Sequence, residues 1–505
     1  MRVNALKYID RYVQLSNNHF NVSITKNDCA EFIPAYERDI IRPGALGHFG
    51  DLLLKTAKSP AMLYYLDNFS SSGPLPENGR MARGAAMRAM AGDGQQATAE
   101  DLGQQGMAAL AKDLALDSST TAQLQKARKT RGLNENYARE VMELHTLGVD
   151  GGYTQQDVTQ AARVLTGWTV YPLQKEGKAF VNRMGEDRMN RQGFVHDGDF
   201  LFSANRHDNG EKTVLGKHFG PDGGYQEGVD LLKMLAHHPS TARFICRKIA
   251  VRFVSDDPAP ALIDKMEKTF LDKDGDIRQV LITMVTSPEF WSAAAVREKT
   301  KSPFELAIGA VRALNGRINQ PYQLYNWVAK MGEKKYYYQA PTGFPDKGAY
   351  WINTGALLYR MNFGLALASG RIPGVTIDLA ALNDHHEPES AQAALTIYSR
   401  LIMPERDLDA TIKRLTPMLT DPGLAKKVDA AVSARAENPG GTMGDDSTAM
   451  AMNENGQAAG GGKERRLRNG RRGGNEAMET AGSNDNPMLA QVVGIIIGSP
   501  EYQRR

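Results

Sequence analysis

The residues best suited to chemistry lie between Asn134 and Trp168, where ionisable side chains stand among apolar helical positions. Glu140, Glu143 and His145 form the closest group of carboxylates and histidine in this segment. A carboxylate can act as a general base, and a histidine can act as an acid or bind a metal ion. We therefore take these three as the candidate catalytic residues of an acid–base or metal site.

A helix that begins near Asn134 is expected to carry these side chains. Asparagine is a favourable N-cap residue, and Gly148 can end the helix in a left-handed conformation. Tyr137, Val141 and Leu144 recur at helical spacing and predict the buried face of the helix. The ionisable residues are expected outside this buried stripe of the helix.

The spacing of the three candidates indicates that one helix cannot complete a site. At about 100° per residue, Glu140 and Glu143 are about 60° apart on the polar side, whereas His145 lies at the other edge of the apolar stripe. A second element must therefore supply further groups to any site that these residues form.

A second helix is expected to follow at once and to form a helical hairpin with the first. Thr154 and Asp157 resemble a capping box, and Gly167 ends the apolar stripe that follows them. Asp150 lies in the turn near His145. Two interpretations remain open: a structural αα-hairpin with buried, hydrogen-bonded polar residues, or a functional polar site.

Ionisable residues in other segments form a second set of candidates. His19 and Asp67 stand in apolar helical surroundings, and His207 and Asp208 precede a glycine-containing turn. Together with Asp150 they could complete a site if the fold brings them to the first hairpin. Each also has a structural interpretation, such as a histidine that is hydrogen-bonded in the core.

Motifs of the common enzyme classes are absent from the sequence. It contains no His-Glu-x-x-His, no Gly-x-Ser-x-Gly elbow, no P-loop and no dinucleotide-binding glycine fingerprint. No cofactor-binding residue is predicted, and the cofactor and the metal content are left unknown. The acidic run 272–276 lacks the glycine and glutamate positions of a calcium loop, so we interpret it as a helix cap. Cys29 and Cys246 are expected in the core.

The composition is that of a soluble globular protein. The chain has 505 residues, 41% hydrophobic and 24% charged, with a net charge of +3. This charge gives no global basic field that would attract nucleic acid. Apolar runs such as 492–497 are far shorter than the ~20 residues needed to cross a bilayer, so no transmembrane segment is expected.

Helical spacing recurs throughout and predicts a mainly α fold: a large multi-helix domain with flexible insertions and a short β-hairpin near 194–219. One helical domain is expected over 1–425, with a flexible or weakly helical insertion at 73–131. The stretch 433–486 is rich in glycine and charged residues and is expected to be a disordered linker. A C-terminal helix at 487–505 should dock back. Two packed helical lobes are the alternative.

Several segments together carry a family resemblance. They are Asn18–Phe20, Pro60–Asn68, Asn134–Glu140, Glu143–Gln155, Leu165–Trp168, His207–Asp208, Lys212–Gly216, Lys301–Glu305 and Ser499–Arg505. On these motifs the chain resembles the bacterial domain-of-unknown-function family numbered eighteen hundred, which has no assigned activity. The matches run from one end of the chain to the other.

The resemblance implies a cellular context. Family members usually carry about another hundred residues ahead of the point where this chain begins, so the chain is expected to be short at its N-terminus. Members are often encoded beside exported, sulfatase-like proteins of the family numbered fifteen hundred and one, which implies such a partner. A periplasmic or secreted location is expected if a preceding segment carries an export signal, and a cytoplasmic one otherwise.

Two functional hypotheses follow from the sequence. The favoured one is a non-catalytic helical binding or assembly protein of the cell envelope or exported fraction. The alternative is a hydrolase of extracellular or envelope polymers that uses a carboxylate–histidine site, with or without a metal ion. Whether the chain is an enzyme is therefore left open.

Overall fold

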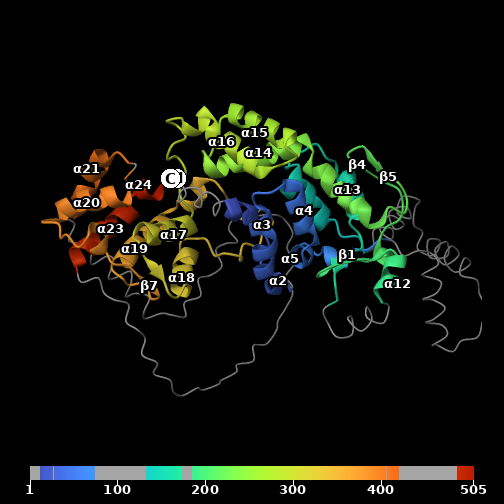
Figure 1. Cartoon of the computed structure of the whole chain (residues 1–505), viewed down its shortest axis with the longest axis horizontal. Helices are drawn as coiled ribbons and strands as arrows, with labels where there is room; N and C mark the ends of the chain where they lie inside the picture. The colour runs from blue at the N-terminus through green and yellow to red at the C-terminus, as the bar shows by residue number, and fades with distance from the viewer. Residues whose placement is uncertain (1–11, 27, 74–131, 173–184, 405, 420–485) are drawn as a thin grey trace, which may run out of the picture. The chain divides into compact units, whose positions relative to one another are not determined.

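The computed structural model is mainly helical, which confirms the predicted fold class (Figure 1). It describes residues 12–26, 28–73, 132–172, 185–404, 406–419 and 486–505. The expected insertion at 73–131, apart from Gly73, and the expected linker at 433–486, apart from Asn486, lie outside these residues. The chain divides into two compact units. Unit 1 comprises residues 1–299 and 335–350, and unit 2 comprises residues 300–334 and 351–505.

Unit 1 is built from helices that range in length from about one turn to about four turns. Residues 12–19 are helical. The helices that follow are α2 (Cys29–Ala35), η1 (Tyr36–Ile41), α3 (Arg42–Gly44), α4 (Phe49–Lys58), α5 (Pro60–Tyr65), η2 (Asn68–Ser70), α9 (Asn136–Glu140), η3 (Val141–Thr146), α10 (Gln155–Val164), α12 (Glu186–Arg191), η4 (Ala204–Arg206), α13 (Gly224–Ala236), α14 (Pro239–Phe253), α15 (Pro260–Asp272), α16 (Ile277–Thr286) and η5 (Pro288–Trp291). Asp276 caps α16 by accepting a hydrogen bond from the amide of Gln279, as expected of the acidic run.

The strands of unit 1 are short and antiparallel. Strand β3 (Phe200–Phe202) pairs with both β1 (Trp168–Val170) and β2 (Val195–Asp197). Strands β4 (Lys212–Val214) and β5 (Lys217–Phe219) form a separate hairpin. The prediction of hairpin structure near 194–219 is therefore confirmed.

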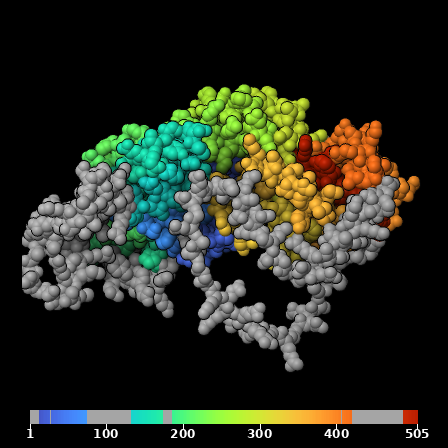
Figure 2. Space-filling view, turned by 180° about the vertical axis from the view of Figure 1, so that it is seen from behind, coloured from blue at the N-terminus to red at the C-terminus, as the bar shows by residue number. Residues whose placement is uncertain are grey.

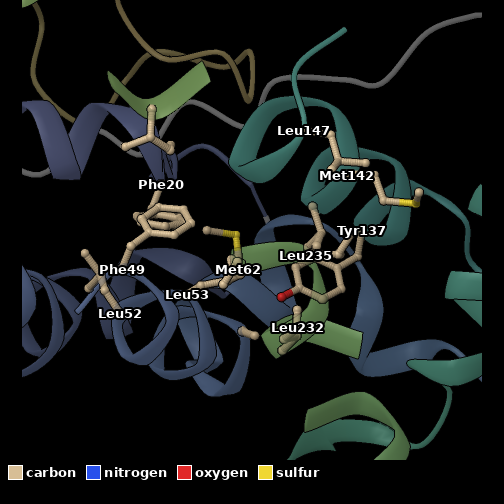
Figure 3. Close-up of a cluster of buried hydrophobic side chains, with 14 of the residues drawn as sticks. Phe20, Phe49, Leu52, Leu53, Met62, Tyr137, Met142, Leu147, Leu232 and Leu235 are labelled. Carbon is tan, nitrogen blue, oxygen red and sulfur yellow. The ribbon is translucent and has the colours of Figure 1, made fainter. Parts of the chain in front are cut away.

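The core of unit 1 brings together segments that are far apart in the sequence. Figure 3 shows Phe20 and Phe49 close together, and Leu232 and Leu235 of α13 beside Tyr137 at the start of the first hairpin helix. All five side chains are almost completely buried. Burial of this kind stabilises the fold by about 25 cal/mol for each Å² of apolar surface. Both cysteines are buried and unpaired, as expected.

Unit 2 has its own hydrophobic core. Its elements are α17 (Pro303–Ala313), β6 (Arg317–Ile318), α18 (Tyr322–Lys330), η6 (Gly348–Trp351, which begins in unit 1), α19 (Thr354–Ala368), β7 (Val375–Thr376), η7 (Ala381–Asn383), α20 (Ala391–Ile402), α21 (Leu408–Leu419), α23 (Pro487–Gly498) and α24 (Pro500–Gln503). Helix α23 packs against α19 and α20. At Gly364 and Gly494 the backbones of α19 and α23 come so close that a Cβ atom at either position would clash.

Candidate functional site

The first hairpin is locked by polar contacts between its two helices. The Arg139 guanidinium donates to Gln155 Oε1 at 2.6 Å, and Gln155 Nε2 donates to Glu135 Oε2 at 2.8 Å. The Thr159 hydroxyl donates to the other oxygen of the Glu135 carboxylate at 2.7 Å. These residues of α9 and α10 therefore hold one another, which is a structural role.

The start of α10 is fixed in the way that the sequence predicts. Thr154 Oγ1 accepts from the Asp157 amide at 3.2 Å, and Asp157 Oδ2 accepts from the Thr154 amide at 2.8 Å, which is a capping box. The second oxygen of Asp157 accepts from the Leu215 amide at 2.7 Å. The Asp157 carboxylate therefore also connects the β4–β5 hairpin to the helical hairpin.

The first helix departs from the predicted α-helix after one turn. Residues Val141–Thr146 are π-helical, with the Leu147 amide bonded to the Met142 carbonyl oxygen five residues earlier. The wider turn brings residues four and five positions apart onto one face, so His145 joins Val141 in the core and Leu144 is only half-buried. The prediction that Leu144 continues the buried stripe is therefore wrong. Gly148 ends the helix with φ +84°, as expected.

Glu140 and Glu143 are half-buried, whereas His145 is buried. The Tyr153 hydroxyl donates to Glu143 Oε2 at 2.9 Å. In the part of the chain that the structure describes, the Glu140 carboxyl has no hydrogen bond or ion pair. Burial and the nearby charge of Glu143 raise the pKa of Glu140 to about 7. Figure 2 shows residues 132–172, in cyan, at the surface of the molecule.

His145 meets His19 in the core of unit 1, together with Lys248 of α14. His19 Nε2 lies 3.0 Å from the His145 carbonyl oxygen, and Lys248 Nζ lies 3.2 Å from His19 Nδ1. Burial and then the charge of Lys248 lower the pKa of His145 to about 3, and the same causes lower the pKa of His19. Both histidines are therefore neutral at pH 7. A neutral imidazole can pack in the core or accept a proton, but it cannot form an ion pair with a carboxylate.

His207 lies in a different buried cluster, with Lys212 and Glu227. Lys212 Nζ donates to Glu227 Oε2 at 2.6 Å, and His207 Nε2 lies 3.4 Å from the same oxygen. His207 Nδ1 lies 3.0 Å from the Thr166 carbonyl oxygen. Burial alone would raise the pKa of Glu227, but His207 and Lys212 hold it below its usual value. The three side chains are 0–4% exposed, so solvent does not reach this cluster directly.

The remaining candidates are held separately. The Asp208 carboxylate makes two hydrogen bonds to the Arg163 guanidinium, of 2.7 and 3.0 Å. Asp67 lies 2.7 Å from Lys26 Nζ near the surface, and its backbone has φ +60°. Asp150 is exposed in the turn of the hairpin.

The structure thus brings together only some of the candidate residues. Glu140 and Glu143 form one group, His19 and His145 a second, and His207 and Asp208 lie near a third with Glu227. Within the described ranges, no three histidine, cysteine or carboxylate side chains are arranged to hold a metal ion.

Sequence reasoning missed Lys248 and Glu227, which complete two of these clusters. Both lie inside helices, α14 and α13, among apolar neighbours. A charged residue at a predicted buried position is the signal that could have found them, since burial of an unpaired charge is costly.

Comparison with known families gives one match. The model of a family described as "protein of unknown function (DUF1800)" matches residues 9–504. The chain belongs to this family. No curated protein and no solved structure matches the chain. No described helix of this DUF1800 member combines the length and apolar character that a membrane span requires.

Glu140 gives this DUF1800 chain a testable dependence of stability on pH. Its pKa is raised from 4.5 to about 7 in the folded protein. The contribution of the protonated carboxyl to the free energy of unfolding is therefore fully present below pH 4.5 and is lost as the pH rises through 7. Glu140→Gln keeps the neutral form at every pH. We expect the variant to be more stable than wild type by about 1–3 kcal/mol at pH 8 and equal to it at pH 4. Urea unfolding at both pH values measures the difference.

Glu135→Gln is the matched control, because Glu135 lies one turn earlier and accepts two hydrogen bonds. It should lower the free energy of unfolding at pH 8 by about 1 kcal/mol. A Glu140→Gln variant that is less stable than wild type at pH 8 would contradict the raised pKa.

Proposed function

We propose that this protein is a non-catalytic binding or assembly protein, and that Glu140 and Glu143 receive a cationic group of a partner protein. One observation carries the proposal: the half-buried Glu140 carboxyl has no hydrogen-bond or ion-pair partner in the described part of the chain and stands beside a second carboxylate. A basic side chain placed there would relieve the repulsion between the two carboxylates.

The surroundings of Glu140 and Glu143 favour a role in binding over a structural role. Arg139 and Glu135, on the same helix, are engaged with α10, so the contacts that lock the hairpin do not need Glu140. A carboxyl whose ionisation is unfavourable in the free protein reduces stability. Such a cost is typical of functional sites, where stability is exchanged for binding. The pair also lies on the outer side of the helix, within reach of another protein.

A fluorescent oligo-lysine peptide is a suitable probe of this site. The cation binds the ionised form of Glu140, whose pKa is about 7. We therefore expect the peptide to bind about tenfold more tightly at pH 8 than at pH 6. Fluorescence anisotropy at constant ionic strength measures both affinities.

Two variants test whether the pH dependence of peptide binding arises from Glu140 and Glu143. Glu140→Gln should bind more weakly at pH 8 and lose the pH dependence, whereas Glu135→Gln should retain it. Equal pH dependence in wild type and Glu140→Gln would mean that the peptide binds elsewhere, and the proposal would fail.

The raised pKa of Glu140 favours a second candidate function, a hydrolase of envelope or extracellular polymers. Glu140 would donate a proton to the leaving group and Glu143 would act as the base, because two carboxylates in different environments can divide these roles. His145 and His19 lie on the core side, so this version uses carboxylates alone. Release of reducing ends from a polysaccharide panel, abolished in Glu140→Gln, would favour it over binding.

The cellular context is also a proposal. The family resemblance supports an envelope or exported location and a sulfatase-like protein as the partner. Titration of the purified partner into wild type and Glu140→Gln tests this by calorimetry. Identical affinities for the two proteins would exclude the carboxylate pair from the contact.

A further inference from the structure

A small cavity lies beside the second cluster of candidate residues, in the core of unit 1. Its volume is about 20 Å³, which is room for little more than one water molecule. Leu15, Phe49 and Ile245 are among its apolar walls. Ser16, His19 and Lys248 are among the polar side chains that line it. An amine therefore stands at the wall of an otherwise largely apolar space.

The partners of His19 fix the position of its proton. A carbonyl oxygen can only accept, so His19 Nε2, which lies 3.0 Å from the His145 carbonyl oxygen, must carry the hydrogen. Because the neutral ring has only one N–H, Nδ1 is an acceptor. Lys248 Nζ at 3.2 Å then donates to it. The ring is therefore oriented as a proton acceptor toward the amine.

The electrostatic surroundings of Lys248 favour the free amine. Burial lowers the pKa of Lys248, and the charge of Asp346 opposes this only in part. Asp346 is itself paired with Arg252 at 3.4 Å. Among the residues that the structure describes, the amine also has near it the two neutral histidines, Tyr12 and Ser16 at the cavity wall, and the Phe244 ring, whose centre lies 5.6 Å from Nζ. This contrasts with Lys212, which is bonded directly to a carboxylate.

We infer that Lys248 is a nucleophilic amine that forms a Schiff base with formaldehyde held in the cavity beside His19. A lysine in a desolvated pocket is an established type of nucleophile for carbonyl compounds. The Nζ lone pair attacks the carbonyl carbon, and one of the two N–H protons passes by way of His19 Nδ1 to the carbonyl oxygen, which becomes a hydroxyl group. The second N–H proton follows the same route to the hydroxyl group as its bond to carbon breaks, so amine and carbonyl become imine and water. The cavity size restricts the carbonyl compound to formaldehyde, which has only two non-hydrogen atoms.

Reductive trapping on the full chain tests this inference. The protein is treated with formaldehyde and sodium cyanoborohydride at pH 6.5, and modified lysines are quantified by peptide mass spectrometry. Lys268, which is 76% exposed, reports ordinary surface reactivity, and Lys212 reports a buried, paired lysine. We expect at least about tenfold more product at Lys248 than at Lys268, because the free amine is the reacting form. A yield at Lys248 equal to or below that at Lys268 overturns the inference.

Two further measurements separate a cavity ligand from general reactivity. With benzaldehyde in place of formaldehyde, the excess at Lys248 over Lys268 should disappear, because the ring does not fit the cavity. An excess that persists with benzaldehyde overturns the part played by the cavity. Lys248→Met should abolish the mapped product and leave the products at other lysines unchanged.

Discussion

Lys212→Met is expected to lower the free energy of unfolding by about 3–5 kcal/mol, the usual loss when one partner of a buried ion pair is removed. The Lys212 ammonium is completely buried and lies 2.6 Å from Glu227 Oε2. Without it, the Glu227 carboxylate stays in the core, where His207 Nε2 lies 3.4 Å from Oε2 and the Gly223 amide donates to Oε1 at 3.2 Å. Urea unfolding of wild type and variant at pH 8 measures the loss.

Two further variants show whether the loss comes from the unpaired charge. Lys217→Met alters an exposed lysine of the same β4–β5 hairpin and should change the stability by less than about 0.5 kcal/mol. Lys212→Met combined with Glu227→Gln removes both charges and should be more stable than Lys212→Met alone. A double variant at least as unstable as the single one would mean that packing, not charge, dominates.

The local features of the first hairpin could be predicted from the sequence because they depend on neighbouring residues. The Thr154 cap and the left-handed Gly148 follow from side-chain chemistry and from the absence of a Cβ atom. The π-helical segment Val141–Thr146 could not be predicted, because no residue type requires it. Its consequence is large: it turns His145 into the core and leaves Glu140 and Glu143 outside.

The clusters that surround the candidate residues depend on contacts between distant segments. His19 and His145 are 126 residues apart, and Lys248 is a further 103 residues along the chain. Helical periodicity predicts which face of α14 is buried, but it does not specify which histidine meets that face. The sequence therefore supplies the residue types of a site, and only the packing decides which of them meet.

The two carboxylates and the buried histidines also differ in what they can do for the protein. Glu140 is half-exposed, and it reduces the stability of the fold when it ionises. The described contacts therefore give no structural reason for a glutamate at this position. His207 and Asp208 are bonded to their neighbours and have one. This difference is why the proposed binding site rests on Glu140, although the histidines are equally prominent in the sequence.

The loop 335–350 supports the segment that carries His19, and its attachment can be tested at one glycine. The Asn18 side-chain amide exchanges two hydrogen bonds with the Phe344 backbone, and Asn21 Nδ2 donates to the carbonyl oxygens of Tyr338 and Ala340 at 3.1 and 2.9 Å. Gly343 has φ +69°, and a Cβ atom there would lie within 3.0 Å of both the backbone carbonyl oxygen and the side chain of Asn18. Only glycine allows this close approach without strain.

Gly343→Ala is therefore expected to lower the free energy of unfolding by about 2–4 kcal/mol, through left-handed backbone strain and loss of the Asn18 hydrogen bonds. Gly152→Ala is the matched control. Gly152 has φ +84°, and a Cβ atom there would meet no other atom within 4 Å, so its substitution adds only strain, about 1–2 kcal/mol. The excess for Gly343, measured by urea unfolding, is the contribution of the Asn18 contact. Equal losses of unfolding free energy at the two glycines would show that the loop can shift without loss of stability. The position of His19 would then be fixed by core packing alone.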